Sequence, residues 1–293
     1  MQFKSYQTKK DGAIRSYDLK SNKNKFTIIA IFVICIIIAV ISLFPAFWVF
    51  MGSFKDIKEF TRSSKILPEK MDFSLLVTSW ERLKFVKYFI NSGIVMLGYC
   101  LCAVIMNGLI AYGLAVLKPK GYKLLYTMIM LCLIIPSSGS IIALYANINR
   151  IGLNGSFIPL WLGAGANAFT VILFQKFFEA IPGDILEAAR LDGTGRLRMF
   201  LNIILPLSKP IISVVIIFAI NSSWSEFLLP YLLLNNSNKQ TVMVHLYKLQ
   251  TDTFTTNVIM IRAILFSVIP PTILFMIFQR RITDGAVGGA IKG

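Results

Sequence analysis

The stretch ILEAARLDGTGRLRMFLNIILP, from Ile185 to Pro206, separates two long apolar segments of the chain. It carries five charged side chains, Glu187, Arg190, Asp192, Arg196 and Arg198. So many charges cannot lie within lipid, because each one is costly to remove from water. The sequence therefore predicts an element that lies on one side of a membrane, between two segments that cross it.

The rest of the chain supports a membrane protein. Of its 293 residues, 56% are hydrophobic and only 15% are charged. Six apolar runs exceed the roughly 20 residues that a helix needs to cross a hydrocarbon core about 30 Å thick. They are Phe26–Phe50, Tyr88–Leu117, Leu124–Ala146, Phe157–Phe178, Ile211–Leu234 and Val258–Phe278. We therefore predict an all-α membrane protein with six transmembrane helices, in a domain spanning residues 26–281.

Basic residues orient these helices. The formal charge is +16, and 18 of the 30 Lys and Arg lie in four places: the N-terminal tail (residues 1–25), the second-to-third connection, the stretch from Lys176 to Lys209, which includes the loop at residues 179–209, and the chain end from Arg280, which includes the C-terminal tail (282–293). Basic residues favour the cytoplasmic side, so both termini are predicted there. The loop at residues 54–87 is then the one sizeable external segment, and we expect short helices in it. The charge is explained by topology, and no nucleic-acid platform is indicated.

The charged stretch has the local signals of two short helices. Asp184 can cap the first helix, with Glu187 three residues later completing a capping box. Gly193 can end that helix in the left-handed conformation. Thr194 can cap the second helix, and Pro206 can close it.

The second short helix is expected to be amphipathic. Its apolar side chains recur at helical spacing and would form one buried face: Leu197, Phe200, Leu201 and Ile204. From the residues alone, this element either rests on lipid headgroups or docks in a groove of a partner protein.

A longer pattern carries a family resemblance. Glu187-Ala188-Ala189, Gly193, Ile203 and Leu205-Pro206 stand at the spacing of the signature loop in permease subunits of ATP-binding-cassette importers. The segments NSGIVML (91–97), AYGLA (111–115) and WSEFLLP (224–230) are similar to those of the carbohydrate-uptake branch, although Ser225 replaces the usual Asn. The ending GAVGGAIKG (285–293) resembles the second permease of maltose-type systems.

The resemblance implies a role and a set of partners. The loop would be a coupling helix that inserts into a cytoplasmic ATPase dimer, and the C-terminal tail would reach the same interface. A second, different permease and an external solute-binding protein would complete an assembly in a bacterial cytoplasmic membrane. The residues expected to contact the ATPase are Glu187, Ala188, Ala189, Arg190, Asp192, Gly193, Ile203, Leu205 and Pro206.

Nucleotide chemistry is not expected in this chain. The sequence has no G-x-x-x-x-G-K-[ST] phosphate loop, so a partner would bind ATP and this chain would need no cofactor. The chain has one histidine, His245, and four cysteines that all fall inside apolar runs. This composition predicts neither a metal site nor a catalytic triad.

The substrate path is predicted near the end of the fifth apolar run. Glu226 is the one acidic residue within a predicted span, and Asn221 and Trp224 precede it. Carboxylate, amide and aromatic groups suit a sugar, but the same residues could instead hold helices together or anchor the membrane interface. Arg262 is expected to snorkel from the last helix.

Alternative functions remain open at this level. The cargo could be a glycerol phosphate or another solute rather than a sugar. A stand-alone secondary transporter or channel would require ion-coupling carboxylates or unwound helix pairs in mid-membrane, for which Glu226 alone is thin support. An intramembrane enzyme lacks a plausible catalytic set.

Overall fold

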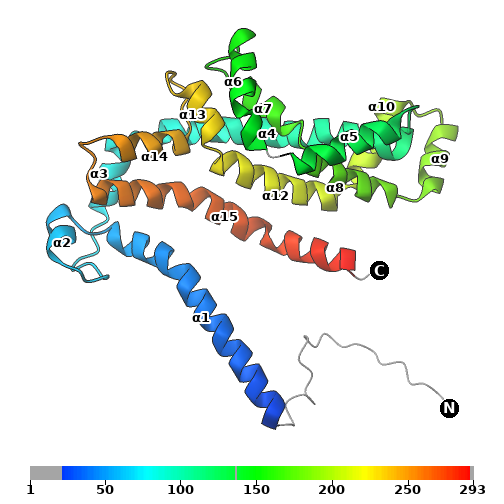
Figure 1. Cartoon of the computed structure of the whole chain (residues 1–293). Coiled ribbons are helices and arrows are strands. Elements are labelled where there is room, and N and C mark those ends of the chain that lie inside the picture. Colours follow the sequence, from blue (N-terminus) through cyan, green and yellow to red (C-terminus); the bar gives the residue numbers. More distant parts are fainter. Residues whose placement is uncertain (1–21, 136, 291–293) are drawn as a thin grey trace. The chain divides into compact units, whose positions relative to one another are not determined.

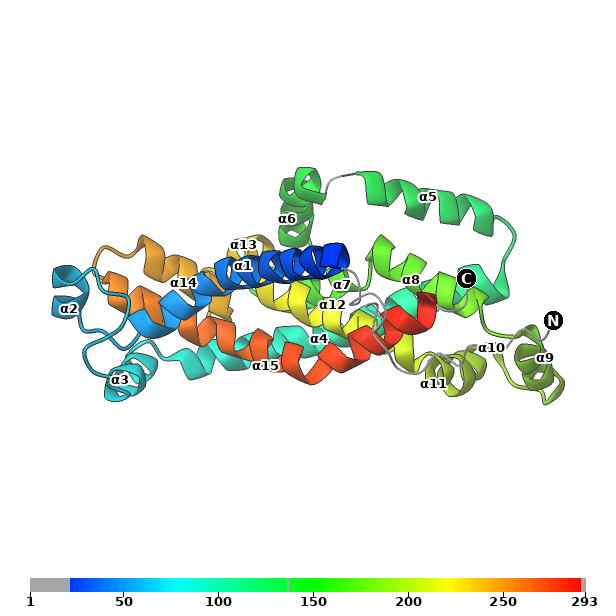
Figure 2. The same cartoon turned by 90° about the horizontal axis from the view of Figure 1, so that it is seen from below.

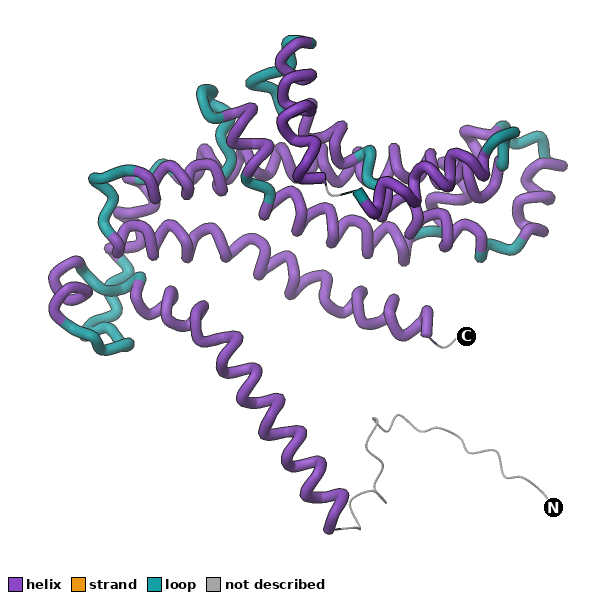
Figure 3. Tube along the Cα trace, in the orientation of Figure 1, coloured by secondary structure: helices purple, strands orange, loops and turns teal. Residues whose placement is uncertain are grey.

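The computed structural model describes residues 22–135 and 137–290, and every regular element in this part of the chain is a helix (Figures 1 and 3). The chain divides into two compact units, residues 1–71 and 72–293. The predicted N-terminal tail lies largely outside the described residues. We describe each unit by itself.

The first unit contains α1 (Asn22–Gly52) and α2 (Ile57–Arg62). The 31 residues of α1 include the first predicted span and present apolar side chains outward along most of the helix. The carboxylate of Asp56 caps α2 by accepting a hydrogen bond from the Glu59 amide at 2.7 Å. Helix α2 thus confirms in part the short helices expected within residues 54–87.

The second unit is built around α4 (Phe85–Tyr112), which continues through a π-helical turn, η2 (Gly113–Leu117). Helices α7 (Ile158–Ala164), α8 (Ala168–Glu179) and α12 (Lys209–Ser225) pack against α4, and α15 (Asn257–Ala290) packs against α12 (Figures 1 and 2). Small residues allow this close approach. A Cβ at Gly98 would overlap the Trp161 ring of α7, and one at Gly165 would overlap Met106 of α4.

The remaining elements of this unit are short. They are α3 (Ser74–Arg82), α5 (Tyr122–Ile134), the 3₁₀ turn η3 (Ser137–Ser140), α6 (Ile141–Arg150), α9 (Gly183–Leu191), α10 (Arg196–Met199), the π turn η4 (Phe200–Ile204), α11 (Leu205–Leu207), α13 (Leu228–Leu234) and α14 (Val242–Thr251). Several of them lie at the two ends of the α4–α12–α15 layer (Figure 1).

Three of the predicted spans are continuous helices. The described segments Lys25–Gly52, Phe85–Leu117 and Asn257–Phe278 are each long and apolar enough to cross a membrane. Two bent helix pairs raise the number of candidate spans to five: α7 with α8, which meet at 44°, and the α10–α11 segment with α12, which meet at 85°.

The other three predicted spans are interrupted, which corrects the expectation of continuous helices there. The third run breaks between α5 and α6, and α5, with 13 residues, reaches only about 20 Å at 1.5 Å per residue. The fourth breaks between α7 and α8. The fifth ends at Ser225 and resumes at Leu228, with Pro230 in the first turn of α13, where its missing N–H costs no helical hydrogen bond.

Buried Asn107 fixes one of these breaks. Its side chain is fully buried, and its amide donates to the carbonyls of Ala103 and Ala164 at 2.8 Å each. Its carbonyl oxygen accepts from the Asn167 amide at 3.0 Å. The Asn167 side chain in turn caps α8 by accepting from the Thr170 amide. The freed backbone groups at the bend are therefore satisfied by side chains, as an apolar environment requires.

The C-terminal segment also differs from the expectation of a separate tail. Helix α15 runs as one helix to Ala290, through most of residues 282–293. Residues 291–293 lie outside the described part of the chain.

Candidate functional site

The first short helix of the charged stretch is α9, which ends as predicted. Gly193 has φ = +72°, in the left-handed region that favours glycine. Its amide donates to the Arg190 carbonyl and the Thr194 amide donates to the Ala189 carbonyl, both at 3.0 Å. This pair of hydrogen bonds is the Schellman motif, so the turn after α9 has a defined geometry.

The two predicted N-caps are wrong. Helix α9 begins after Pro182 with no side-chain cap, and Asp184 lies inside its first turn. A carboxylate in that position still interacts favourably with the helix dipole. Helix α10 begins after Gly195, whose backbone is extended, so Thr194 does not cap it. The Thr194 amide belongs instead to the Schellman motif of the preceding helix.

The apolar face of the second helix is only partly as predicted. Phe200 and Ile204 are fully buried, whereas Leu197 and Leu201 are exposed. The backbone between Phe200 and Ile204 forms the π turn η4 rather than an α-helical turn, and this wider turn shifts which side chains share a face. Pro206 does not end the helix, because the chain continues through α11 and turns at Ser208.

The turn at Ser208 sets the direction of the charged stretch. Ser208 is fully buried, and its hydroxyl donates to the Ile204 carbonyl at 2.7 Å. Beyond it, α12 leaves at 85° to the α10–α11 segment. If α12 crosses the membrane, the α10–α11 segment runs roughly along the membrane surface.

Tyr112 joins the charged stretch to the central helix. Its hydroxyl donates to the Arg196 carbonyl at 3.1 Å, and its ring lies 5.5 Å from that of Phe200. Phe200 in turn packs closely against Gly108, where an added Cβ would lie 3.2 Å from its ring. Tyr112 is buried at the end of α4, so these contacts attach α10 directly to that helix.

Other predicted coupling residues divide between a buried and an exposed side. Ala189 packs in the core together with Leu186, and Ile203 and Leu205 are half-buried against the same cluster. The exposed side consists of Glu187, Ala188, Arg190, Asp192, Gly193 and Pro206. The sequence reasoning missed Leu191, which is 89% exposed at the end of α9. Its position between two charged residues, Arg190 and Asp192, was the signal in the sequence that this leucine is exposed.

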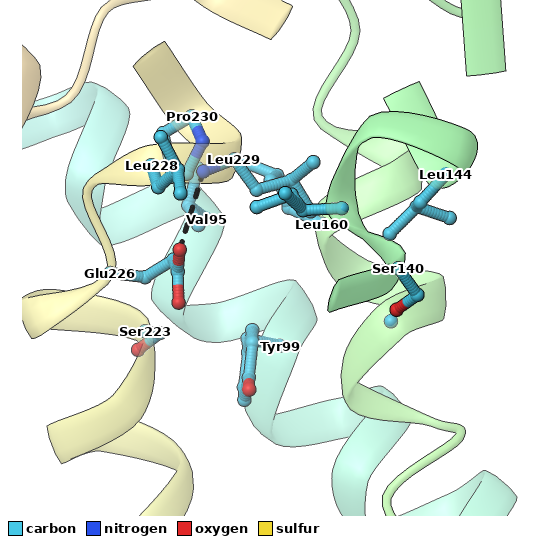
Figure 4. Close-up of a pocket in the computed structure, with 12 residues that line it drawn as sticks. Val95, Tyr99, Ser140, Leu144, Leu160, Ser223, Glu226, Leu228, Leu229 and Pro230 are labelled. Carbon is cyan, nitrogen blue, oxygen red and sulfur yellow. Dashed lines mark hydrogen bonds between the residues drawn. The ribbon is translucent and has the colours of Figure 1, made fainter. Parts of the chain in front are cut away.

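Glu226 lines a cavity in the same unit. The cavity has a volume of about 340 Å³ and lies between α4, α6, α7, α12 and α13. Figure 4 shows Glu226, Ser223 and Tyr99 on one side, with Ser140 and Leu144 across from them. One carboxylate oxygen of Glu226 accepts from the Leu229 amide at 3.3 Å, which helps to begin α13.

The three predicted pathway residues do not share this cavity. Trp224 is only 6% exposed, and its indole nitrogen donates to the Ser267 carbonyl of α15 at 3.0 Å. Asn221 lines a separate, mainly apolar cavity of about 260 Å³ between α12 and α15. The interpretation of a helix–helix hydrogen bond therefore holds for Trp224, and only Glu226 faces the larger cavity.

Arg262 does not snorkel, which corrects the sequence expectation. It is 6% exposed and donates to the Ser79 hydroxyl of α3 at 3.2 Å. Nearby His245 stacks on Tyr88 with ring centroids 3.8 Å apart. Burial lowers the pKa of His245 to about 4, a hydrogen bond with the Leu83 backbone opposes this, and Lys248 adds to the lowering. His245 is thus a neutral packing group at neutral pH.

The chain is similar to known transport proteins over most of its length. Residues 103–286 match the family described as binding-protein-dependent transport system inner membrane component. The diacetylchitobiose uptake system permease protein NgcG of Streptomyces coelicolor is 30% identical over 87% of this chain and 85% of its own. The sn-glycerol-3-phosphate transport system permease protein UgpE of Rhizobium meliloti is 32% identical over 71% of this chain and 73% of its own.

A solved structure has a similar fold. It belongs to a bacterial ABC transporter involved in the import of the acidic polysaccharide alginate. The TM-score is 0.78 at 23% identity, over 89% of this chain and 98% of the other. With long apolar helices and a family match over well over half its length, the chain is an integral inner-membrane protein and belongs to the binding-protein-dependent transport system inner membrane component family.

Proposed function

We propose that this chain is one permease subunit of an ATP-driven importer and forms half of the translocation path for an oligosaccharide or related sugar. Family membership supports the transport role. The permease relative for diacetylchitobiose, which aligns over most of both chains, supports a sugar as cargo. Six spans with both termini in the cytoplasm follow if α5–α6, α7–α8 and α12–α13 each complete one interrupted crossing.

The observation that carries the proposal is the way the charged stretch is attached. Buried Leu186, Ala189 and Tyr112 join it to the helical core, while Arg190 and Leu191 face outward. An element held rigidly on one side and exposed on the other can transmit a rigid-body motion across an interface. We therefore assign residues 179–209 as the coupling element for a cytoplasmic ATPase dimer.

The remaining partners follow from the same assignment. ATP is bound by the ATPase, so this chain is not itself an enzyme and needs no cofactor. A second, different permease completes the path, and an external solute-binding protein delivers the sugar. The C-terminal segment Gly285–Gly293 is a second contact with the ATPase in this proposal. Among the described residues, the outward apolar side chains of α1 suit lipid or the second permease.

A glycerol phosphate is the alternative cargo, because the UgpE relative is similarly close in sequence. A stand-alone secondary transporter is the alternative mechanism. It predicts activity without an ATPase partner.

The test is purification of the tagged chain from its native membrane, followed by reconstitution into liposomes. We expect an ATPase and a second permease to co-purify, and neutral oligosaccharide to enter only when ATP and the solute-binding protein are supplied. Uptake driven by an ion gradient by this chain alone would contradict the proposal. ATP-dependent uptake restricted to a glycerol phosphate would instead identify the alternative cargo.

A further inference from the structure

The cavity beside Glu226 has an unbalanced charge. Its described lining consists of Glu226, the hydroxyl residues Tyr99, Ser140 and Ser223, and apolar side chains, mainly of Leu. It contains no Lys, Arg or His among the residues that the structure describes. A carboxylate without a lining cation gives the cavity a negative potential, and low-dielectric walls concentrate such a field.

The backbone and one hydrogen bond orient the carboxylate toward the cavity. The backbone leaves α12 at Ser225, and Glu226 occupies the extended residue that ends the helix. One oxygen is engaged by the Leu229 amide. In Figure 4 the second oxygen points toward the space between Ser223 and Tyr99. The Glu226 side chain is exposed, so this oxygen is available to a solute.

The other lining groups suit an uncharged sugar. The hydroxyls of Tyr99 and Ser140 lie on opposite walls and can hydrogen-bond to sugar hydroxyls. Leu144, Leu160 and Leu229 offer apolar surface to the C–H faces of a sugar ring. The volume of about 340 Å³ is near the lower limit of about 300 Å³ for ligand pockets, so the cavity accommodates part of an oligosaccharide.

We infer that Glu226 makes this cavity a charge filter, which admits neutral or amino sugars and opposes phosphorylated sugars and uronic acids. The inference rests on the proposed function, because it treats the cavity as part of the translocation path. It predicts a cargo class different from the anions to which the names of two similar proteins refer, sn-glycerol-3-phosphate and acidic alginate. A carboxylate about 6 Å from a solute anion would weaken its binding roughly tenfold in a partly aqueous site.

The potential of the cavity can be measured without knowing the sugar. Leu144→Cys places a thiol on the wall opposite Glu226, in a full transporter complex in which the four native cysteines of this chain have been replaced. The complex without Leu144→Cys gives the background reaction of the other subunits. The thiol is then treated with two methanethiosulfonate reagents, one with a cationic trimethylammonioethyl group and one with an anionic sulfonatoethyl group. The ratio of the two reaction rates, cationic to anionic, reports the local potential. Glu226→Gln removes the charge while keeping an oxygen that can accept from the Leu229 amide. Glu81→Gln, on an exposed position of α3 outside the cavity, is the matched control.

The selectivity is then measured on the same complexes in nanodiscs, as equilibrium binding of cellobiose and of cellobiouronic acid. We expect the cation-to-anion rate ratio to fall about tenfold in Glu226→Gln and to stay unchanged in Glu81→Gln. We also expect Glu226→Gln to bind cellobiose nearly as wild type does and to lose most of its discrimination against the acid.

Two results would overturn the inference while leaving the proposed function intact. One is a rate ratio that Glu226→Gln does not change. The other is wild-type binding of the uronic acid as tight as that of cellobiose. Failure of the proposed function gives a different result: no oligosaccharide enters liposomes that contain the wild-type complex with ATP and the solute-binding protein, although the rate ratio still responds to Glu226→Gln. That outcome would overturn the assignment of the cavity to a sugar path and the filter with it.

Discussion

Two neighbouring residues of the fifth apolar run have different surroundings in the structure. Trp224 and Glu226 are two positions apart, and the sequence placed both in the substrate path. The structure directs the Trp224 indole to Ser267 of α15, whereas the Glu226 carboxylate faces a cavity. Composition indicates that both residues are unusual in a membrane helix, but the direction of each side chain depends on neighbours far away in the chain.

Trp224 is therefore expected to contribute to stability rather than to transport. Trp224→Phe removes the donor to the buried Ser267 carbonyl, which costs about 1–3 kcal/mol. Trp161→Phe is a matched control, because the indole nitrogen of Trp161 is buried without a hydrogen-bond partner. Thermal unfolding in detergent should show a lower midpoint for Trp224→Phe than for Trp161→Phe, with the order of sugar preference unchanged in both. An altered sugar preference in Trp224→Phe would place its ring in the path.

His245 makes a pH-dependent contribution to stability. Its folded pKa, lowered to about 4 by burial, lies below the ordinary value of 6.5. Below pH 6.5 the unfolded chain therefore binds a proton that the folded chain does not, so stability falls as the pH decreases from 6.5 toward 4. The expected loss is roughly 1–3 kcal/mol after allowance for partial exposure.

The measurement is the thermal midpoint at pH 7.5 and pH 5 for the wild type and for His245→Gln. The variant lacks the titrating ring, so its midpoint should fall less between the two pH values, even if it starts lower. An equal fall in both proteins would mean that His245 is not the group responsible.

Among the elements, the α7–α8 pair shows how one side chain fixes a bend. Two hydrogen bonds of Asn107 join the two sides of the break, one to Ala164 at the end of α7 and one to Asn167 at the start of α8. Asn107→Ala removes the acceptor of the Asn167 amide and the donor to the Ala164 carbonyl. Each group left without a partner lowers the free energy of unfolding by about 1–3 kcal/mol.

We expect this variant to lower the thermal midpoint and to make the α7–α8 connection accessible to proteolysis. Asn147→Ala, at an exposed position of α6, should do neither. Wild-type stability and protease resistance in Asn107→Ala would show that the bend is maintained by packing alone.

Helix boundaries in the coupling element show which parts of the site were predictable. Gly193 was identified from sequence because a left-handed residue after a helix has few alternatives to glycine. The buried face of the next helix was not identified in full, because the π turn at Phe200–Ile204 changes the residue period. That turn forms where Phe200 packs between Tyr112 and Gly108, so its cause lies in tertiary contacts.

At the scale of the whole molecule, hydropathy located the membrane segments but not their breaks. Phe85–Leu117 and Asn257–Phe278 are continuous because each is a long apolar run whose backbone is satisfied within one helix. The interrupted runs are also apolar, but two of their breaks use the side chains of Asn107 and Glu226 to satisfy freed backbone groups. Glycine and proline occur in these runs, but their presence is consistent with a continuous, closely packed helix as well as with an interrupted one.

The central claim is that the α9–α10 turn docks a cytoplasmic ATPase in a fixed geometry. Gly193 and Gly195 provide a matched pair to test it, because both are exposed and neither has a neighbour within 4 Å of an added Cβ. They differ in backbone conformation. Gly193 has φ = +72°, whereas Gly195 has φ = −64° and ψ = 156°, which valine adopts readily.

The decisive measurement is recovery of the ATPase in a pull-down from membranes that express each variant, with sugar uptake measured in the same membranes. Gly193→Val strains the turn by about 1–2 kcal/mol while leaving the spanning helices intact. It should insert and pair with its partner permease normally but recover little ATPase and transport little sugar, whereas Gly195→Val should retain most of both activities. ATPase recovery and uptake at the wild-type level in Gly193→Val would contradict the account and leave the charged stretch as a connector at the lipid surface.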